Sequence, residues 1–280
     1  MGLFDRLFRR GGGPASAPAE EQAPPVEGPS GPPVLLAGNI QGIGGREGQE
    51  DSFALVNVSD QAGQETRGLL AAVADGMGGM EDGKAASQCA VDALLEDFAR
   101  WEGERPVPDW LYAGALSASR QVFARCGGRG GTTLAAVHIL GDALHWVSVG
   151  DSAIFLKRGG GVFQLNREHT YLNRLYSQEL EEERIDKDRA ELDPDARRLT
   201  AFVGMEALAQ VDLSLRPWRL RRGDVVLLCS DGVSGVLTPP ELLEAMSLPP
   251  AEGCALLETM VLEKQIPEQD NYTGVMIAYQ

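Results

Sequence analysis

Short apolar segments separated by glycine, aspartate or asparagine make up most of the chain after residue 33. Segments of this length that are rich in β-branched residues and bounded by turn formers are typical of β-strands. Their hairpin-like spacing favours antiparallel sheets. We predict strands over 34–42, 53–58, 68–74, 131–140, 144–149, 152–157, 162–165, 211–216, 225–229 and 273–279.

Apolar residues spaced by threes and fours interrupt this strand pattern. Such spacing places them on one face of an amphipathic helix. The pattern predicts two adjacent helices in the first half of the chain and a helical pair before the last strand. The predicted helices cover 83–101, about 109–126, about 239–247 and 250–264.

Between His169 and Leu199 the composition changes to a charged, helix-favouring run. A run of this kind is usually an exposed face. It predicts a solvated helical insertion between two strands, with no direct chemical role for its charges. We expect His169, at its start, to serve as a structural hydrogen-bonding residue rather than a catalytic one.

The first 33 residues differ from the rest. Residues 1–10 place leucine and phenylalanine at helical spacing beside arginines, which is typical of a short amphipathic hook for a membrane or a partner. Ten residues are marginal for an isolated helix, so a frayed tail is the alternative. Residues 11–33 contain little to bury and predict a disordered linker. The folded domain is expected over 34–280.

The composition is that of an ordinary globular protein. With 280 residues, 43% of them hydrophobic, the chain can form one large domain or two small ones. It has 25 basic and 41 acidic side chains and a net charge of −16. This charge argues against binding of nucleic acid or of an anionic membrane by the main body. It suits bound cations instead.

Cysteine and histidine offer little metal chemistry. The four cysteines are far apart without CxxC spacing, so we expect them to be reduced and mostly buried. The three histidines form no HExxH motif. The sequence contains no apolar stretch of roughly 20 residues and no signal-peptide pattern, which favours a cytoplasmic location.

Acidic residues recur at the tips of apolar segments, beside glycine, serine or asparagine. One such acid is typical of a turn, whereas five suggest convergence at one edge of the stacked sheets. A cluster of like charges is tolerable only when cations neutralise it. Oxygen ligands without sulfur favour Mg²⁺ or Mn²⁺. The five acids are Asp51, Asp75, Asp151, Asp231 and Asp270.

The order of these motifs resembles the type 2C (PPM) family of metal-dependent serine/threonine protein phosphatases, in its bacterial form. The resemblance runs from about Asn39 to Tyr279. Each motif alone is weak, but six in the family's order are specific. They are Arg46 with Glu50-Asp51, Asp75-Gly-Met-Gly-Gly leading to Gly83 and Ala86-Ser87, Gly131-Thr-Thr, Gly150-Asp-Ser, Ser230-Asp-Gly and Asp270-Asn.

The resemblance implies a binuclear metal centre. Asp75 would bridge two Mn²⁺ or Mg²⁺ ions, and Asp231 and Asp270 would complete the site of one ion. Two ions sharing one water lower its pKa and direct it at phosphorus. By resemblance, this activated water hydrolyses phosphoserine and phosphothreonine without a phosphoenzyme.

The remaining implied ligands lie beside this pair. The Gly76 carbonyl with Glu50 or Asp51, partly through water, would serve the other ion. The glycines after Asp75 leave a main-chain oxygen accessible. Arg46 matches the family's phosphate-clamping arginine, whose planar fork suits two phosphate oxygens.

Two departures from the family pattern affect the chemistry. Asp151 and Asp231 resemble ligands of a third, weaker ion, but Gly235 stands where a further acid is usual, which makes that ion doubtful. Met77 stands where many eukaryotic members have a proton-donating histidine. Leaving-group protonation would then fall to metal-bound water or another group.

The resemblance also implies the architecture and the partners. We expect an α+β fold in which two stacked antiparallel β-sheets form a sandwich flanked by helices on both sides. A helical flap over about 169–200 would lie beside the active site. Expected partners are proteins phosphorylated on Ser or Thr and a cognate Ser/Thr kinase, with the enzyme as a monomer.

Two other function classes remain open on the sequence. One is a catalytically inactive sensor or scaffold that binds phosphoproteins; the retained acids argue against it. The other is a two-metal hydrolase acting on nucleic acid or a small phosphate ester. The net charge of −16 disfavours the nucleic-acid version.

Overall fold

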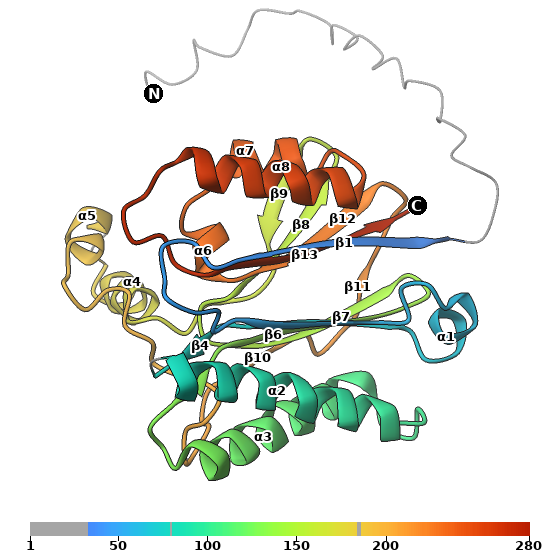
Figure 1. The fold of residues 1–280 in the computed structure, drawn as a ribbon, viewed down its shortest axis with the longest axis horizontal. Coiled ribbons are helices and arrows are strands. Elements are labelled where there is room, and N and C mark those ends of the chain that lie inside the picture. The colour runs from blue at the N-terminus through green and yellow to red at the C-terminus, as the bar shows by residue number, and fades with distance from the viewer. Residues whose placement is uncertain (1–32, 79, 184–185) are drawn as a thin grey trace, which may run out of the picture. The chain divides into compact units, whose positions relative to one another are not determined.

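The computed structural model describes residues 33–78, 80–183 and 186–280. Except for Pro33, the predicted N-terminal hook and linker lie outside the described residues. The described part confirms the α+β class, with two antiparallel sheets that lie one above the other (Figure 1). Within it, none of the helices is long and apolar enough to cross a membrane.

The first sheet has five strands. Apolar side chains alternate or run continuously along each, as expected for strands covered on one or both faces. Neighbouring strands are antiparallel throughout. Their order in the sheet is β1 (Leu35–Gly42), β13 (Tyr272–Tyr279), β12 (Asp224–Cys229), β8 (Ala153–Arg158) and β9 (Gly161–Gln164).

The second sheet has six strands and is also antiparallel. One short strand, β11 (Trp218–Arg219), pairs with β7 beside the main path. A separate small ladder joins β4 (Gly76–Met77) and β5 (Gly131–Thr132). The order along the main path is β10 (Asp212–Leu213), β7 (Ala143–Val149), β6 (Leu134–Leu140), β3 (Leu69–Ala74) and β2 (Ser52–Val56).

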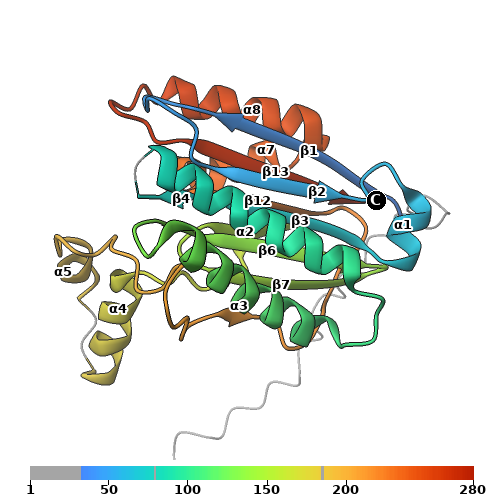
Figure 2. The same cartoon turned by 60° about the horizontal axis from the view of Figure 1, so that its bottom comes forward.

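Helices cover the outer face of each sheet. Helices α2 (Met80–Arg100) and α3 (Val107–Cys126) lie side by side across the second sheet (Figure 2). Helices α7 (Pro239–Ala245) and α8 (Pro250–Glu263) cover the first sheet (Figure 1). The short helices are α1 (Gln61–Thr66), α4 (Tyr171–Glu181), α5 (Lys187–Glu191) and α6 (Asp231–Ser234).

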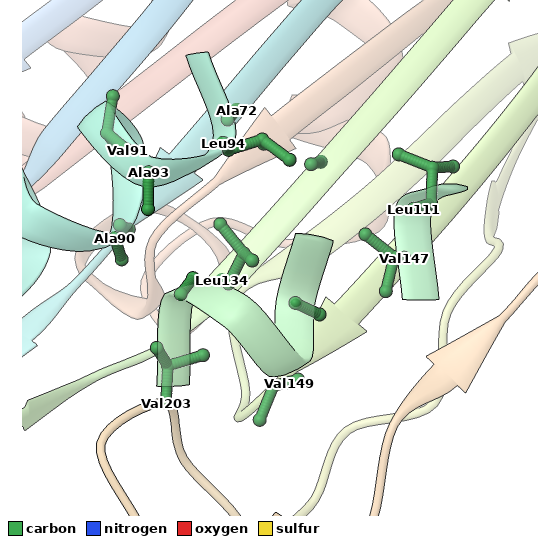
Figure 3. Close-up of a cluster of buried hydrophobic side chains, with 14 of the residues drawn as sticks. Ala72, Ala90, Val91, Ala93, Leu94, Leu111, Leu134, Val147, Val149 and Val203 are labelled. Atoms are coloured by element: carbon green, nitrogen blue, oxygen red, sulfur yellow. The ribbon is translucent and has the colours of Figure 1, made fainter. Parts of the chain in front are cut away.

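Strand β3 shows how the layers pack. All six of its residues are buried. Leu69, Ala71 and Val73 join the core between the two sheets. Leu70, Ala72 and Ala74 face the opposite way, into the core beneath α2 and α3. Figure 3 shows part of that second core, where Ala72 and Leu94 approach each other. Because both faces of β3 are covered, its sequence is an unbroken apolar run.

The predicted strands and long helices are confirmed, with local differences. The segment 131–140 divides at Thr133 into β5 and β6, because Thr133 bonds to Asp75 instead of continuing one ladder. Strands β4 and β11 and helices α1 and α6 were not predicted, since each is too short to show a period. All four cysteines are free, and three of them are buried.

Candidate metal centre

The antiparallel register brings the predicted acids to one end of the sandwich. Asp75 follows the end of β3, where Ala74 pairs with Ser52 at the start of β2. In the other sheet, Cys229 at the end of β12 pairs with Ala153 at the start of β8. Antiparallel neighbours begin and end at the same edge. Residues before one strand therefore meet residues after the next; we call this edge the carboxylate end.

A cavity of about 320 Å³ opens at the carboxylate end. Arg46 and six of the seven predicted metal ligands lie in its wall. The seventh, Asp51, is 0% exposed and lies behind the wall, where its Oδ2 accepts a 2.9 Å hydrogen bond from Ser230. The wall consists of Arg46, Glu50, Asp75, Gly76, Met77, Gly78, Thr133, Asp151, Leu199, Asp231, Asp270 and Asn271.

Threonines of the neighbouring segment fix the backbone of Asp75. Its N–H donates to Thr133 Oγ1 at 2.9 Å, and its carbonyl accepts from Thr133 N–H at 2.9 Å and Thr132 Oγ1 at 2.8 Å. Thr133 Oγ1 also bonds to Ser152 Oγ at 2.6 Å. The tip of β3 is therefore tied to two neighbouring segments.

Glycines allow the close approach of α2 to this tip. A Cβ on Gly76 would lie 2.2 Å from the Gly83 carbonyl oxygen, and one on Gly83 would lie 1.8 Å from Glu50 Oε2. At Gly76 the neighbouring backbone leaves no room for a side chain, whereas at Gly83 the Glu50 carboxylate would have to move. These contacts explain why glycines follow Asp75 in the sequence: they leave space for the first turns of α2 and for the Glu50 carboxylate.

Asn271 holds the loop that carries Arg46 and Glu50. Its Nδ2 donates to the carbonyls of Ile43 at 2.8 Å and Gly48 at 2.9 Å, and its Oδ1 accepts from Glu50 N–H at 2.7 Å. One carboxamide thus satisfies three main-chain groups of residues 43–50. Each of these main-chain groups lies more than 220 positions from Asn271 in the sequence.

Burial and mutual repulsion raise the pKa values of the clustered acids. Burial is the main cause for Asp75, whose pKa lies well above its usual value, with further increases from Asp51 and Asp231. Burial likewise raises the pKa of Asp51 to about 6 and that of Asp151 to about 7. The pKa of Asp231 is also raised by burial and by Asp270, while a hydrogen bond with the Asp75 side chain opposes the rise.

The donor set suits a hard cation. The negatively charged side chains that line the cavity are all carboxylates. Carboxylate oxygens are the type of ligand that Mg²⁺ and Mn²⁺ prefer. The buried Asp51 Oδ1 has no hydrogen-bond partner. Positive charge at this end would relieve the repulsion that raises the pKa values. On charge and chemistry, the residues fit divalent ions.

The carboxylates nevertheless bond to protein groups in this structure. Asp270 Oδ2 accepts from Arg46 at 2.6 Å, and its Oδ1 accepts from Asn271 N–H at 2.8 Å. In the described ranges, no three or more His, Cys, Asp or Glu side chains are grouped so that they could hold a metal ion. Ion binding would therefore require these side chains to exchange partners.

Arg46 is placed for such an exchange. Its side chain is 54% exposed, and that of Asp270 is 39% exposed. An ion pair this accessible contributes little to stability, about 0–1 kcal/mol. The guanidinium can therefore leave the carboxylate for a phosphate in the same cavity at little cost.

The doubtful third site lacks its extra acid. Asp151 and Asp231 line a second groove together with Gly235, which has no side chain to coordinate an ion.

His169, at the start of the flap, accepts a 3.1 Å hydrogen bond at Nδ1 from Gly150 N–H, as expected of a structural residue.

Two supporting residues received no role from the sequence: Lys84 was not singled out, and Ser87 was named only as part of a motif. Lys84 donates to the Asp51 carbonyl at 2.6 Å and to Ser52 Oγ at 2.8 Å. Ser87 donates to the Glu50 carbonyl. These contacts, like those of Asn271 and Thr133, involve main-chain groups distant in sequence. The only available signal was their place inside the motifs.

Comparison with known proteins identifies the family of the chain. The family described as Protein phosphatase 2C matches residues 49–265. The chain belongs to the protein phosphatase 2C family.

Relatives come from several bacteria. The serine/threonine protein phosphatase PstP of Mycobacterium tuberculosis is 32% identical over 232 residues, covering 79% of this chain. The chain spans only 42% of the length of that relative. The serine/threonine phosphatase stp of Listeria welshimeri is 30% identical and covers 61% of this chain and 68% of the relative.

Solved structures share the fold. The M. tuberculosis PstP structure has a TM-score of 0.72 and 28% identity, covering 88% of this chain and 98% of that one. A structure of the PstP catalytic domain in complex with two manganese ions has a TM-score of 0.69 and 29% identity, covering 88% of this chain and 99% of that one.

Proposed function

We propose that this chain is a metal-dependent protein serine/threonine phosphatase that hydrolyses phosphoserine and phosphothreonine with an activated water. The observation that carries the proposal is the set of buried carboxylates around one cavity, with Arg46 in its wall, in a chain of this family. A relative's catalytic domain with two manganese ions supports a binuclear centre.

The proposed ligands follow from the cavity wall. Asp75, Asp231 and Asp270 would hold one ion. Asp75, the Gly76 carbonyl, and Glu50 or Asp51 would hold the other. Two divalent ions, when bound, supply positive charge and a water of lowered pKa near phosphorus. Asn271 and Thr133 would keep the two ligand-bearing loops in place.

Arg46 would bind the phosphate. A guanidinium donates two parallel N–H groups to a pair of phosphate oxygens and stabilises negative charge that develops during transfer. Its exposed pairing with Asp270 leaves it accessible to a substrate entering the cavity.

The wall offers no serine, cysteine or histidine nucleophile within the described residues. Thr133 is its one hydroxyl, and that oxygen is bonded to both Asp75 N–H and Ser152. Because the carboxylates of the wall are the proposed metal ligands rather than nucleophiles, attack by water without a phosphoenzyme is the route that we propose. Met77 has no proton to donate, so the leaving oxygen takes its proton from water or another group.

The natural substrates would be phosphorylated proteins, with a cognate Ser/Thr kinase as the opposing enzyme. The test uses the full chain with Mn²⁺ and phosphothreonine, phosphoserine, aryl phosphate and nucleotide substrates. We expect phosphopeptide turnover that is abolished by a chelator and restored by Mn²⁺. Mn²⁺ binding without turnover would identify a scaffold, and turnover of nucleotides alone would identify a different hydrolase.

A further inference from the structure

A second groove, of about 600 Å³, adjoins the cavity beneath the flap. The two share Asp151, Asp231 and Asp270 in their walls. Its outer side includes Glu168 and Arg197 from the flap region. We call it the flap groove. A substrate whose phosphorylated residue enters the cavity would place neighbouring residues near this groove.

The flap groove is strongly acidic. Its wall contains Glu168 and Glu268 in addition to the three shared acids, which are proposed metal ligands, against one guanidinium, that of Arg197; with ions bound, the two glutamates carry the negative charge of the groove. Glu168 accepts a 2.9 Å hydrogen bond from Gln164, and no ion pair of Glu168 or Glu268 is found in the part of the chain that the structure describes. The two glutamates are therefore available to a cation from outside.

Gln269 in the same wall also requires a donor. It is 8% exposed, and its Nε2 donates to the carbonyls of Gly232 at 3.1 Å and Asp270 at 3.3 Å. Its buried Oε1 has no partner. An unsatisfied buried acceptor costs about 1–3 kcal/mol. A ligand that carries only donors would suit the glutamates, and it would bond to this oxygen once the Gln269 side chain turned toward the groove.

The wall also has an apolar part, formed by Phe155, Leu172, Val236 and Ile266. Lysine and arginine side chains pack an aliphatic stem against such surfaces and keep the charged head at polar groups. The groove thus combines the two surfaces that a basic side chain needs.

We propose that the flap groove binds a lysine or arginine side chain of the phosphoprotein substrate, a few residues from the phosphorylated serine or threonine. This inference rests on the proposed phosphatase function. It assigns Glu168, Glu268 and Gln269 to substrate selection, and it gives the enzyme a preference for basic phosphorylation sites. The net charge of −16 favours the approach of such sites.

Arg197 acts against this preference. As the one described cation in the wall, it lies near Asp231 and reduces the negative potential of the groove. Removal of its charge should strengthen binding of a basic side chain, whereas removal of the glutamate charges should weaken it. The two kinds of substitution are therefore expected to change the preference in opposite directions.

The experiment compares phosphothreonine peptides that carry either arginine or glutamate at each flanking position in turn. The readout is the ratio of kcat/KM for the arginine peptide to that for the glutamate peptide, which does not depend on the active fraction of a preparation. At its best position, the wild-type ratio should be about fivefold or more. It should approach one in Glu168→Gln/Glu268→Gln and increase in Arg197→Gln.

A matched control, Glu252→Gln on α8, removes one exposed charge elsewhere and should leave the ratio unchanged. Phosphopeptide turnover with a wild-type ratio of one at every position would overturn the inference while the proposed function stands. An unchanged ratio in the double variant, or a lower one in Arg197→Gln, would also overturn it.

Absence of phosphopeptide turnover would defeat the proposed function instead. The groove is then judged by fluorescence anisotropy with unphosphorylated arginine and glutamate peptides. Tighter binding of the arginine peptide to the wild type than to Glu168→Gln/Glu268→Gln supports the groove; equal binding overturns it.

Discussion

At the two ends of the sandwich, burial shifts the pKa values of ionisable groups in opposite directions. At the carboxylate end, burial raises the pKa of Asp51 to about 6 and that of Asp151 to about 7. At the other end, where β6 turns into β7, burial lowers the pKa of His138 to about 4. We call this the hairpin end. Burial disfavours the charged form in each case.

The surroundings of these groups differ. His138 is 0% exposed, bonds to the Arg67 carbonyl at 2.7 Å and lies among the rings of Phe98, Trp101 and Trp110. The aromatic rings favour the neutral form of the imidazole, although its buried Nδ1 has no hydrogen-bond partner. The carboxylates instead lie against one another, with Asp51 Oδ1 unpartnered. The hairpin end is arranged for stability, whereas the carboxylate end is arranged for a positive ligand.

Removing one charge at the carboxylate end should produce the largest effect. Asp75→Asn removes the predicted bridging ligand, and we expect kcat to fall by about a hundredfold to a thousandfold or more. With a chelator present, its stability at neutral pH should equal or exceed that of the wild type, because a carboxylate with a raised pKa is destabilising when ionised. Kinetics and thermal unfolding measure the two effects.

Asp142→Asn is the matched control for this prediction. Asp142 lies at the hairpin end and pairs with Arg219 at 2.5 Å. Its substitution should leave kcat unchanged. If Asp75→Asn retained activity within a few-fold of the wild type, or if the control lost as much, the contrast between the two ends would be wrong.

Protonation of His138 should lower the free energy of unfolding at acidic pH. Because its pKa is lowered from 6.5 to about 4, its contribution is fully present above pH 6.5 and is lost as the pH falls toward 4. The full loss is at most about 3 kcal/mol. The raised pKa values of Asp51 and Asp151 act in the opposite sense, since protonation below pH 7 relieves their repulsion.

His138→Phe isolates the histidine contribution. Phenylalanine fits the aromatic surroundings but does not titrate, so the difference in unfolding free energy between variant and wild type should change with pH between 4 and 6.5. The variant also leaves the Arg67 carbonyl without this partner, which shifts the difference by a constant. A difference that is independent of pH would show that His138 is not the titrating group.

Arg46→Lys should have an intermediate effect. Lysine keeps the charge but cannot offer a planar fork to two phosphate oxygens. We expect kcat/KM on phosphopeptides to fall about tenfold or more, with Mn²⁺ affinity little changed. Arg100→Lys is the control, since Arg100 forms an exposed pair with Asp97 at 2.8 Å away from the cavity. Equal losses in both variants would exclude a specific phosphate contact.

The smallest effect is expected when a single methyl group is added at Gly83. In Gly83→Ala the new Cβ would lie 1.8 Å from Glu50 Oε2, so the carboxylate must move. Mn²⁺ affinity should fall by about tenfold, while the helix itself gains propensity. Gly114→Ala on α3 meets nothing nearer than Leu94 Cδ1 at 3.3 Å and should bind Mn²⁺ normally. Unchanged affinity in Gly83→Ala would remove Glu50 from the ligand set.

Much of the fold could be predicted because its signals are local. Strand β3 is an unbroken apolar run, and α8 has a clear start at two prolines. The five acids stood out because each follows or precedes such a run. Their convergence followed from antiparallel pairing together with the family resemblance.

The contacts that hold the site could not be predicted in the same way. The Asn271 side chain bonds to residues more than 220 positions away, and the pairing of Arg46 with Asp270 spans 224. No local periodicity encodes such contacts. The flap groove likewise depends on how the flap lies against α6, which the charged run alone does not determine.

The most direct test of the carboxylate end is a calorimetric titration of the chelator-treated chain with Mn²⁺, for the wild type and for Asp75→Asn. We predict two ions bound per wild-type chain, and weakened binding at both sites in the variant because the bridging ligand is gone. Absence of Mn²⁺ binding to the wild type, or identical titrations for the two proteins, would contradict the account.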